Sequence, residues 1–173
     1  MARGHLGVEW DLAKASPEEI ACLRHWIAFY TQERDLLLAG NVIRMDGPDA
    51  NVMVHGVVSA DRSRAIFAAA ALDSLYPDPA VRLKLRGLDS EATYRVEPIF
   101  PGTTPSGLLP PGWWGQPTAA GHPIEPTSLR GTTQEDVTFP GSEFPGSILT
   151  HVGLTSPRIH PDQVVLYRIA RIG

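Results

Sequence analysis

Apolar residues recur at helical spacing in the first quarter of the chain, within residues 17–39. The stripe consists of Ile20, Leu23, Ile27, Tyr30 and Leu37, widened by Cys22, Trp26 and Phe29. Ser16, Pro17 and Glu19 give the start signal of a helix, because the serine can cap it, proline suits its first position and the glutamate completes a capping box. Gly40 supplies the end. The pattern predicts a helix over residues 17–39, and its wide apolar arc predicts packing against two neighbours.

Beyond Gly40 the period changes to two. Residues 51–58 and 63–72 are β-rich runs separated by the turn "SADR", which predicts an antiparallel hairpin. "VRLKLRGL" (81–88) alternates apolar with basic residues and leads through "DSEAT" into "YRVEPIF" (94–100), which predicts a second pair. The last run, 163–172, is apolar on both sides of its centre, as expected for a central strand.

Composition supports a mainly β chain. The 173 residues suit one domain with a real core, and 16 Gly and 16 Pro indicate many turns and few long helices. We therefore expect an antiparallel β-sandwich preceded by one amphipathic helix. The net charge of −4 and the scattered basic residues predict no nucleic-acid partner. No apolar run reaches the roughly 18–20 residues that span a bilayer, which predicts a soluble protein with no membrane partner.

The segment from about 101 to 145 is rich in Pro, Gly, Thr and Ser, and it predicts a long loop on the sandwich. Its adjacent Trp113 and Trp114 allow two interpretations. Exposed tryptophan faces bind sugars and anchor interfaces. Buried, the same residues would fix the loop on the sandwich.

Other candidate chemistry is sparse. Cys22 is the single cysteine, which excludes an intramolecular disulfide, predicts a structural thiol and fits a cytoplasmic location. The histidines lack metal-ligand spacing and predict no metal site; they are His5, His25, His55, His122, His151 and His160. Glycine-rich nucleotide motifs and the G-x-S-x-G hydrolase motif are missing, so we expect no cofactor and no serine nucleophile.

Six segments in order carry a resemblance to a known family. They are "GHLGVEWD", "SPEEI" running into "WIAFY", "GNVIRMD", "VHGVVSADRSRAIF", "RLKLRGLD" with "YRV", and "LTHVGL" with "PRIHPDQVVL". Together they resemble the C-terminal end of the α-galactosidases of glycoside hydrolase family 36, in which a (β/α)8 barrel precedes an antiparallel β-sandwich. The resemblance implies that residues 1–40 are a remnant of the barrel, its last strand and last helix, and that 41–173 form the sandwich. Because one strand cannot close a barrel, the chain is expected to be a fragment.

The family's chemistry is retaining hydrolysis of terminal α-linked galactose by two aspartates. The family's K-x-D-x-N nucleophile stretch is missing here, so the resemblance assigns no catalytic residue. His5, Glu9 and Asp11 stand near the end of the implied barrel strand and are the candidates there for galactoside binding, although solvated or helix-leading carboxylates are the commoner case. Glu9 and Asp11 would share one face of that strand.

The resemblance implies a non-catalytic structural domain whose partner is a catalytic barrel, in the same chain or encoded separately. Galactosides would be bound by the intact enzyme. Without the barrel, part of the helix stripe must face water, which predicts self-association into a homo-oligomer. The alternative function is a free-standing carbohydrate-binding sandwich that uses Trp113 and Trp114 as a stacking surface.

Overall fold

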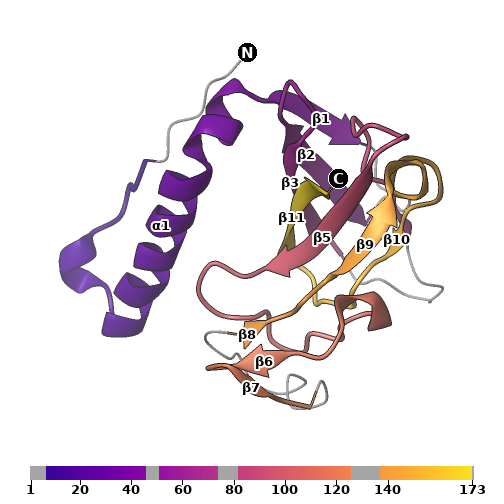
Figure 1. Cartoon of the computed structure of the whole chain (residues 1–173). Helices are drawn as coiled ribbons and strands as arrows, with labels where there is room; N and C mark the ends of the chain where they lie inside the picture. Colours follow the sequence, from indigo (N-terminus) through magenta and orange to yellow (C-terminus); the bar gives the residue numbers. More distant parts are fainter. Residues whose placement is uncertain (1–6, 46–50, 74–81, 126–136, 173) are drawn as a thin grey trace.

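The computed structural model describes residues 7–45, 51–73, 82–125 and 137–172. One helix, α1 (Pro17–Ala39), lies beside a set of antiparallel strands (Figure 1). The strands are β1 (Asn41–Met45), β2 (Val52–Val58), β3 (Arg64–Ala71), β4 (Arg82–Leu83), β5 (Thr93–Ile99), β6 (Thr118–Ala119), β7 (His122–Pro123), β8 (Val137–Thr138), β9 (Ser142–Pro145), β10 (Leu154–Thr155) and β11 (Val164–Ile172). The described residues also form the short helical turns η1 (Leu12–Lys14), η2 (Gly112–Trp114) and the π-helical η4 (Ile148–Val152). The mainly β prediction is confirmed.

Helix α1 begins and ends where its sequence signals predicted. The Ser16 hydroxyl accepts a hydrogen bond from the Glu19 backbone at 3.2 Å, and the Ser16 backbone donates to the Glu19 carboxylate at 2.8 Å. At the other end, the Gly40 amide donates to the Leu36 carbonyl at 2.8 Å. A Cβ at Gly40 would collide with the Val57 side chain, so this junction with β1 admits only glycine. None of the described helices is long and apolar enough to cross a bilayer.

The main sheet has six antiparallel strands in the order β1-β2-β3-β11-β5-β9. The predicted hairpin of β2 and β3 is confirmed, with Val54 opposite Ala69. β11 lies between β3 and β5, as its two-sided apolar pattern predicted. The last strand in sequence is therefore in the middle of the sheet.

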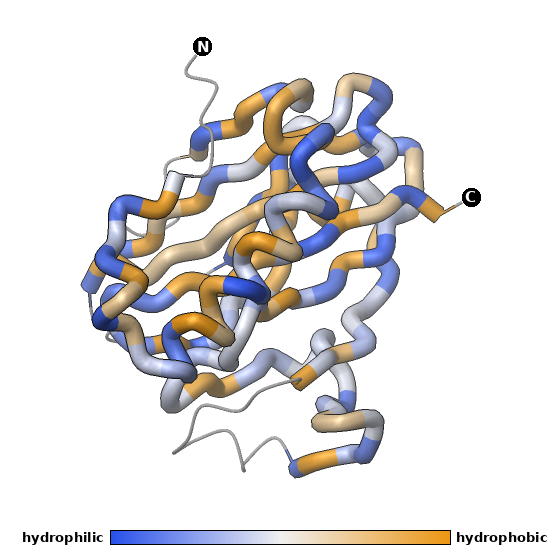
Figure 2. Tube along the Cα trace, turned by 90° about the vertical axis from the view of Figure 1, so that its left-hand side faces the viewer, coloured by the Kyte–Doolittle hydropathy of each residue, from blue (hydrophilic) through white to orange (hydrophobic). Residues whose placement is uncertain are grey.

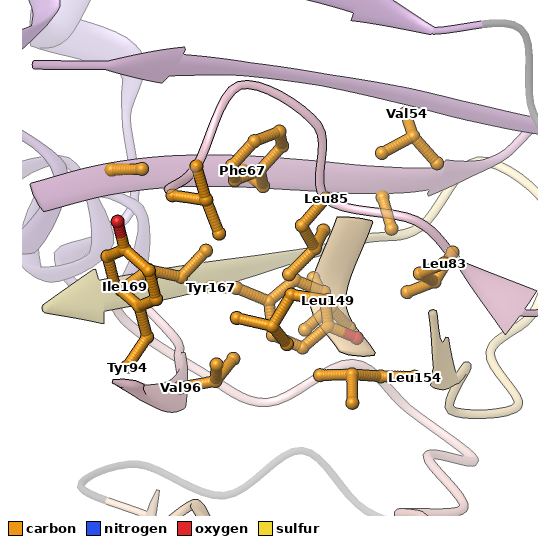
Figure 3. Close-up of a cluster of buried hydrophobic side chains, with 14 of the residues drawn as sticks. Val54, Phe67, Leu83, Leu85, Tyr94, Val96, Leu149, Leu154, Tyr167 and Ile169 are labelled. Atoms are coloured by element: carbon orange, nitrogen blue, oxygen red, sulfur yellow. The ribbon is translucent and has the colours of Figure 1, made fainter. Parts of the chain in front are cut away.

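The core lies between one face of this sheet and the segments that cross it (Figure 3). Tyr94, Tyr167 and Phe67 come from the sheet, and each is at most 1% exposed. Figure 3 shows Leu85 and Leu149 pointing toward these side chains from the covering layer. This layer includes the small sheet β10-β4, and a separate small sheet, β7-β6-β8, adds to the domain.

The predicted pairing of residues 81–88 with 94–100 is wrong for the described residues. β4 covers only Arg82–Leu83 and pairs with β10, whereas β5 pairs with β11 and β9. The alternation itself is correct, because Leu83 and Leu85 are each 1% exposed. The turn after β4 carries the chain from the covering layer back to β5 of the main sheet, and Gly87 in this turn has a φ of +90°, a conformation that favours glycine. The partners of β4 and β5 are thus strands that lie far away in the sequence.

The segment predicted as a long loop is folded back on the sheet in its described part. It contains β6, β7 and β8, and its end forms β9, the edge strand beside β5. Residues 126–136 lie outside the described residues. Phe139 and Trp114 from this segment are buried in the core.

Two buried tyrosines on neighbouring strands give a matched pair for measurement. The Tyr94 hydroxyl donates to the Arg62 carbonyl at 2.8 Å and accepts from the Asp89 amide at 3.0 Å. The Tyr167 hydroxyl is buried with no partner among the described residues, and burial raises the pKa of Tyr167 well above its usual range. We expect Tyr94→Phe to lower the free energy of unfolding by about 1–3 kcal/mol, because two backbone groups lose their partner.

Tyr167→Phe is the control. It removes a hydroxyl that was desolvated without compensation, so stability should stay unchanged or rise by up to about 1 kcal/mol. Urea unfolding followed by circular dichroism measures both variants. Equal losses in the two variants would contradict this account of the hydrogen bonds.

Candidate functional interface on helix α1 and the segment before it

Helix α1 contacts the sheet through a narrow inner side. Among its described residues only Leu36 and Glu33 are buried, at 3% and 5% exposure. The Glu33 carboxylate accepts a hydrogen bond from Arg168 Nε of β11 at 3.1 Å, and Arg168 Nη2 lies 3.0 Å from the same oxygen in an ion pair. A buried carboxylate is stable only when paired in this way. The ion pair therefore fixes the helix over the centre of the sheet.

A second contact joins the beginning of α1 to the turn after β5. Gly102 has a φ of +99°, and a Cβ there would lie 3.1 Å from the Cys22 sulfur. Between these contacts is a cleft of about 320 Å3, and the described residues that line it include His25, Phe29 and Arg168. The described lining residues include no Asp or Glu.

Two large apolar side chains of α1 are open to solvent, among exposed polar and charged ones. Trp26 is 36% exposed and Ile27 43%. The prediction that this helix packs against two neighbours is therefore wrong within the described part of this chain. Figure 2 views the molecule from the α1 side, where hydrophobic and hydrophilic stretches alternate along the trace.

The segment before α1 adds to this apolar surface. Val8, Trp10 and Leu12 are 42%, 45% and 48% exposed. Figure 1 shows this segment on the side of α1 that is away from the sheet. We call these three residues, together with Trp26 and Ile27, the helix face. Large apolar side chains gathered at one surface mark an interaction site.

The predicted strand at the beginning of the chain is wrong for residues 7–11, none of which is in a strand. A strand needs hydrogen-bonded neighbours, and here the chain forms the short turn η1 instead. The Asp11 carboxylate accepts from the Ala13 amide at 3.2 Å and pairs with Lys14 at 3.1 Å. Asp11 and the exposed Glu9 therefore do not share a strand face as predicted. His5 lies outside the described residues.

The two adjacent tryptophans pack within the domain. Trp114 is 0% exposed, and its ring centroid lies 4.9 Å from that of Phe139 and 5.8 Å from that of Phe100. The half-buried Trp113 donates from Nε1 to the Thr155 carbonyl at 2.9 Å. Trp114 has no open face for a sugar, so its proposed place in a stacking surface is wrong. The two phenylalanines near the ends of the same segment were the signal that could have predicted burial.

Strongly shifted pKa values are found in a turn and in the core. The hydroxyl of Ser59 and the amide and hydroxyl of Ser63 lower the pKa of Asp61 to about 2. This turn joins β2 to β3, so the shift has a structural cause. No group of three or more His, Cys, Asp or Glu that could hold a metal occurs among the described residues. The helix face is thus the most distinctive candidate surface, and its character is that of an interface.

Comparison with known proteins identifies relatives of one kind. The chain is 36% identical over 99 residues to "Alpha-galactosidase" of Escherichia coli, a match that covers 56% of this chain and 14% of the relative. It is 34% identical over 95 residues to "Alpha-galactosidase AgaA" of Geobacillus stearothermophilus, covering 54% of this chain and 13% of the relative. The chain thus spans about a seventh of the length of these curated relatives.

Solved structures share the fold. An α-galactosidase from Lactobacillus brevis matches 99% of this chain with a TM-score of 0.67 and 22% identity, over 19% of its own length. The family 36 α-galactosidase AgaB of Geobacillus stearothermophilus matches 94% with a TM-score of 0.61 and 20% identity, over 17% of its length. The model of the glycosyl hydrolase family 36 C-terminal domain matches residues 52–169. This chain, over most of its length, therefore belongs to the family of glycosyl hydrolase family 36 C-terminal domains.

Proposed function

We propose that this chain is the non-catalytic C-terminal portion of an α-galactosidase that releases terminal α-linked galactose. The support is the family membership together with relatives named as α-galactosidases. The chain matches only 14% and 13% of those relatives. Hydrolysis then belongs to a catalytic barrel, in the same polypeptide or in a separately encoded partner.

The exposed helix face is the observation that carries the structural role. Trp26 and Ile27 are exposed on a helix that the Glu33–Arg168 pair fixes to the sandwich. Covering roughly 300 Å2 of such surface would contribute several kcal/mol at about 25 cal/mol per Å2. A gain of this size is comparable to the whole stability of a domain. The domain would therefore cover apolar barrel surface while the barrel covers α1.

The residues that line the two described clefts support a non-catalytic role for this chain. Retaining glycosidases need two carboxyl groups about 5 Å apart across the scissile bond. No carboxyl group occurs among the described residues that line the cleft beside α1, or among those that line a second cleft between η4 and the chain after β4. Binding of galactosides and the two catalytic carboxylates are therefore assigned to the barrel.

The purified chain is expected to give no turnover of 4-nitrophenyl α-galactoside, because the nucleophile and the acid/base account for most of the rate of such a reaction. Release of nitrophenol measures this, with the Escherichia coli relative as positive control. Turnover that is inhibited by galactose would contradict the proposal.

A chimera tests the positive side of the same proposal. In the Escherichia coli relative, the stretch that matches this chain over 99 residues is replaced by the corresponding stretch of this chain. We expect the chimera to hydrolyse the substrate, and a deletion of the same stretch to be inactive or insoluble. An inactive, correctly folded chimera would show that this domain cannot take the place of its relative.

A further inference from the structure

The second cleft lies on the covering layer of the sandwich. It has a volume of about 460 Å3 and is bordered by the chain that follows β4 and by the π-helical turn η4. Its lining residues are Lys84, Arg86, Gly87, Leu88, Ser90, Thr150 and His151. Two of these side chains carry a positive charge and three more have polar groups. None of these described lining residues carries a carboxylate.

The alternation of apolar and basic residues over 83–86 places side chains both in the core and in this cleft. Leu83 and Leu85 point into the core, so Lys84 and Arg86 between and after them are placed on the outer surface. The Leu85 amide donates to the Leu149 carbonyl at 2.8 Å, which holds this segment against η4. The two basic residues and His151 are therefore brought to one concave surface by main-chain contacts.

The charges of the cleft are not neutralised by ion pairs among the described residues. Lys84 and Arg86 form none there, whereas the nearby Asp89 is paired with Arg171 at 3.6 Å. Glu91 is the acidic group next to the lining, and its carboxylate accepts from the Ser90 hydroxyl at 3.5 Å. An excess of positive charge remains, in a chain whose net charge is −4. Such a local excess attracts anions.

The histidine is held in place at the other side. Its Nδ1 lies 3.1 Å from the Ser147 carbonyl and 2.9 Å from the Thr150 hydroxyl. With Nδ1 occupied by these partners, Nε2 is the ring nitrogen left for a bound group. The side chain is exposed, so a ligand can reach it.

We propose that this cleft binds a phosphate group, either as free phosphate or carried by a small phosphorylated sugar. Arginine binds phosphate through two parallel hydrogen bonds and lysine adds a point charge. Both residue types line this cleft with a histidine and two hydroxyl-bearing side chains. The volume of about 460 Å3 admits a hexose as well as the phosphate. The site is separate from the helix face and does not depend on the proposed role in an α-galactosidase.

Titration of the full chain with inorganic phosphate tests the proposal, with amide and imidazole NMR shifts as the readout. We expect saturable shifts at His151 and at the backbone of residues 84–90. In the double variant Lys84→Gln/Arg86→Gln the apparent affinity should fall at least about tenfold, because both cationic contacts are lost. Glucose 6-phosphate in a parallel titration distinguishes the two sources: tighter binding than phosphate identifies a phosphorylated sugar, and equal or weaker binding identifies free phosphate.

The matched control is Arg24→Gln/Arg44→Gln, which removes the same charge from exposed positions outside the cleft. It should leave the phosphate shifts unchanged. Equal weakening in the two double variants, or the same shifts with chloride at equal ionic strength, would show general charge screening and overturn the site. Circular dichroism of each variant verifies the fold, and all the changes lie at exposed side chains.

Discussion

Replacement of Trp114 by alanine is expected to lower the free energy of unfolding by about 3–5 kcal/mol, the range for removal of a large aromatic side chain from a core. Trp114 is 0% exposed, and its ring contacts aromatic rings from three parts of the chain. These belong to Phe100, Phe139 and Tyr167, at centroid distances of 5.8, 4.9 and 6.2 Å. Its backbone carbonyl also accepts from the Gly141 amide at 3.0 Å. The side chain therefore joins the segment 101–145 to the main sheet.

Chemical unfolding followed by circular dichroism gives this value, and two variants serve as controls. Trp113→Ala should cost less, since Trp113 is only half-buried. Trp114→Phe should also cost less than Trp114→Ala because an aromatic ring stays in the cavity, and the indole Nε1 that it removes has no partner among the described residues. Suppose instead that Trp114→Ala kept the stability of the parent chain but lost a fluorescence response to galactose or raffinose that the parent chain shows. That result would contradict the structural role of Trp114 and support the sugar-binding function.

The double variant Trp26→Glu/Ile27→Glu is expected to convert a self-associating chain into a monomer. Trp26 and Ile27 of the helix face are 36% and 43% exposed, and the segment before α1 carries three more exposed apolar side chains. Burial of such surface between copies would stabilise an oligomer by several kcal/mol at about 25 cal/mol per Å2. Two carboxylates placed there would have to be desolvated, which opposes association. Sedimentation velocity over a range of concentrations measures the change.

The control places the same charges on the other side of the domain, in Ile148→Glu/Val152→Glu. These apolar residues of η4 are 37% and 48% exposed, so the substitutions are matched in exposure. This variant should associate as the parent chain does. A parent chain that stays monomeric at high concentration would contradict the role given to the helix face. A control that also becomes monomeric would show that net charge, rather than the location of the charge, prevents association.

Local signals predicted the elements that depend on neighbouring residues. The bounds of α1 follow from a capping box and a glycine, both of which act within one turn. The β2–β3 hairpin follows from a short turn in which Asp61 accepts from Ser59 and Ser63. The central place of β11 follows from its two-sided apolar run. In each case the residues that decide the structure are close in sequence.

Features that depend on distant partners could not be predicted in the same way. The edge of β5 is occupied by β9, about 50 residues later, so its pairing with residues 81–88 was not determined by their alternation. At the candidate site, Glu9 and Asp11 were selected by assuming a strand whose neighbours this structure does not contain. The burial of Trp114 depends on Phe139, and the dipeptide alone allowed either outcome. Of the helix face, only Trp26 and Ile27 belong to the apolar arc that the sequence showed; the exposed side chains before α1 were not predicted.

The junction at Gly40 limits how far α1 can move relative to the sheet. Gly40 alone separates α1 from β1, its Cβ position is blocked by Val57, and the Leu36 and Val58 carbonyl oxygens lie 2.7 and 3.0 Å away from that position. Together with the Glu33–Arg168 pair, this leaves the helix little freedom to swing. A domain that packs on α1 would therefore be held at a fixed orientation relative to the sandwich.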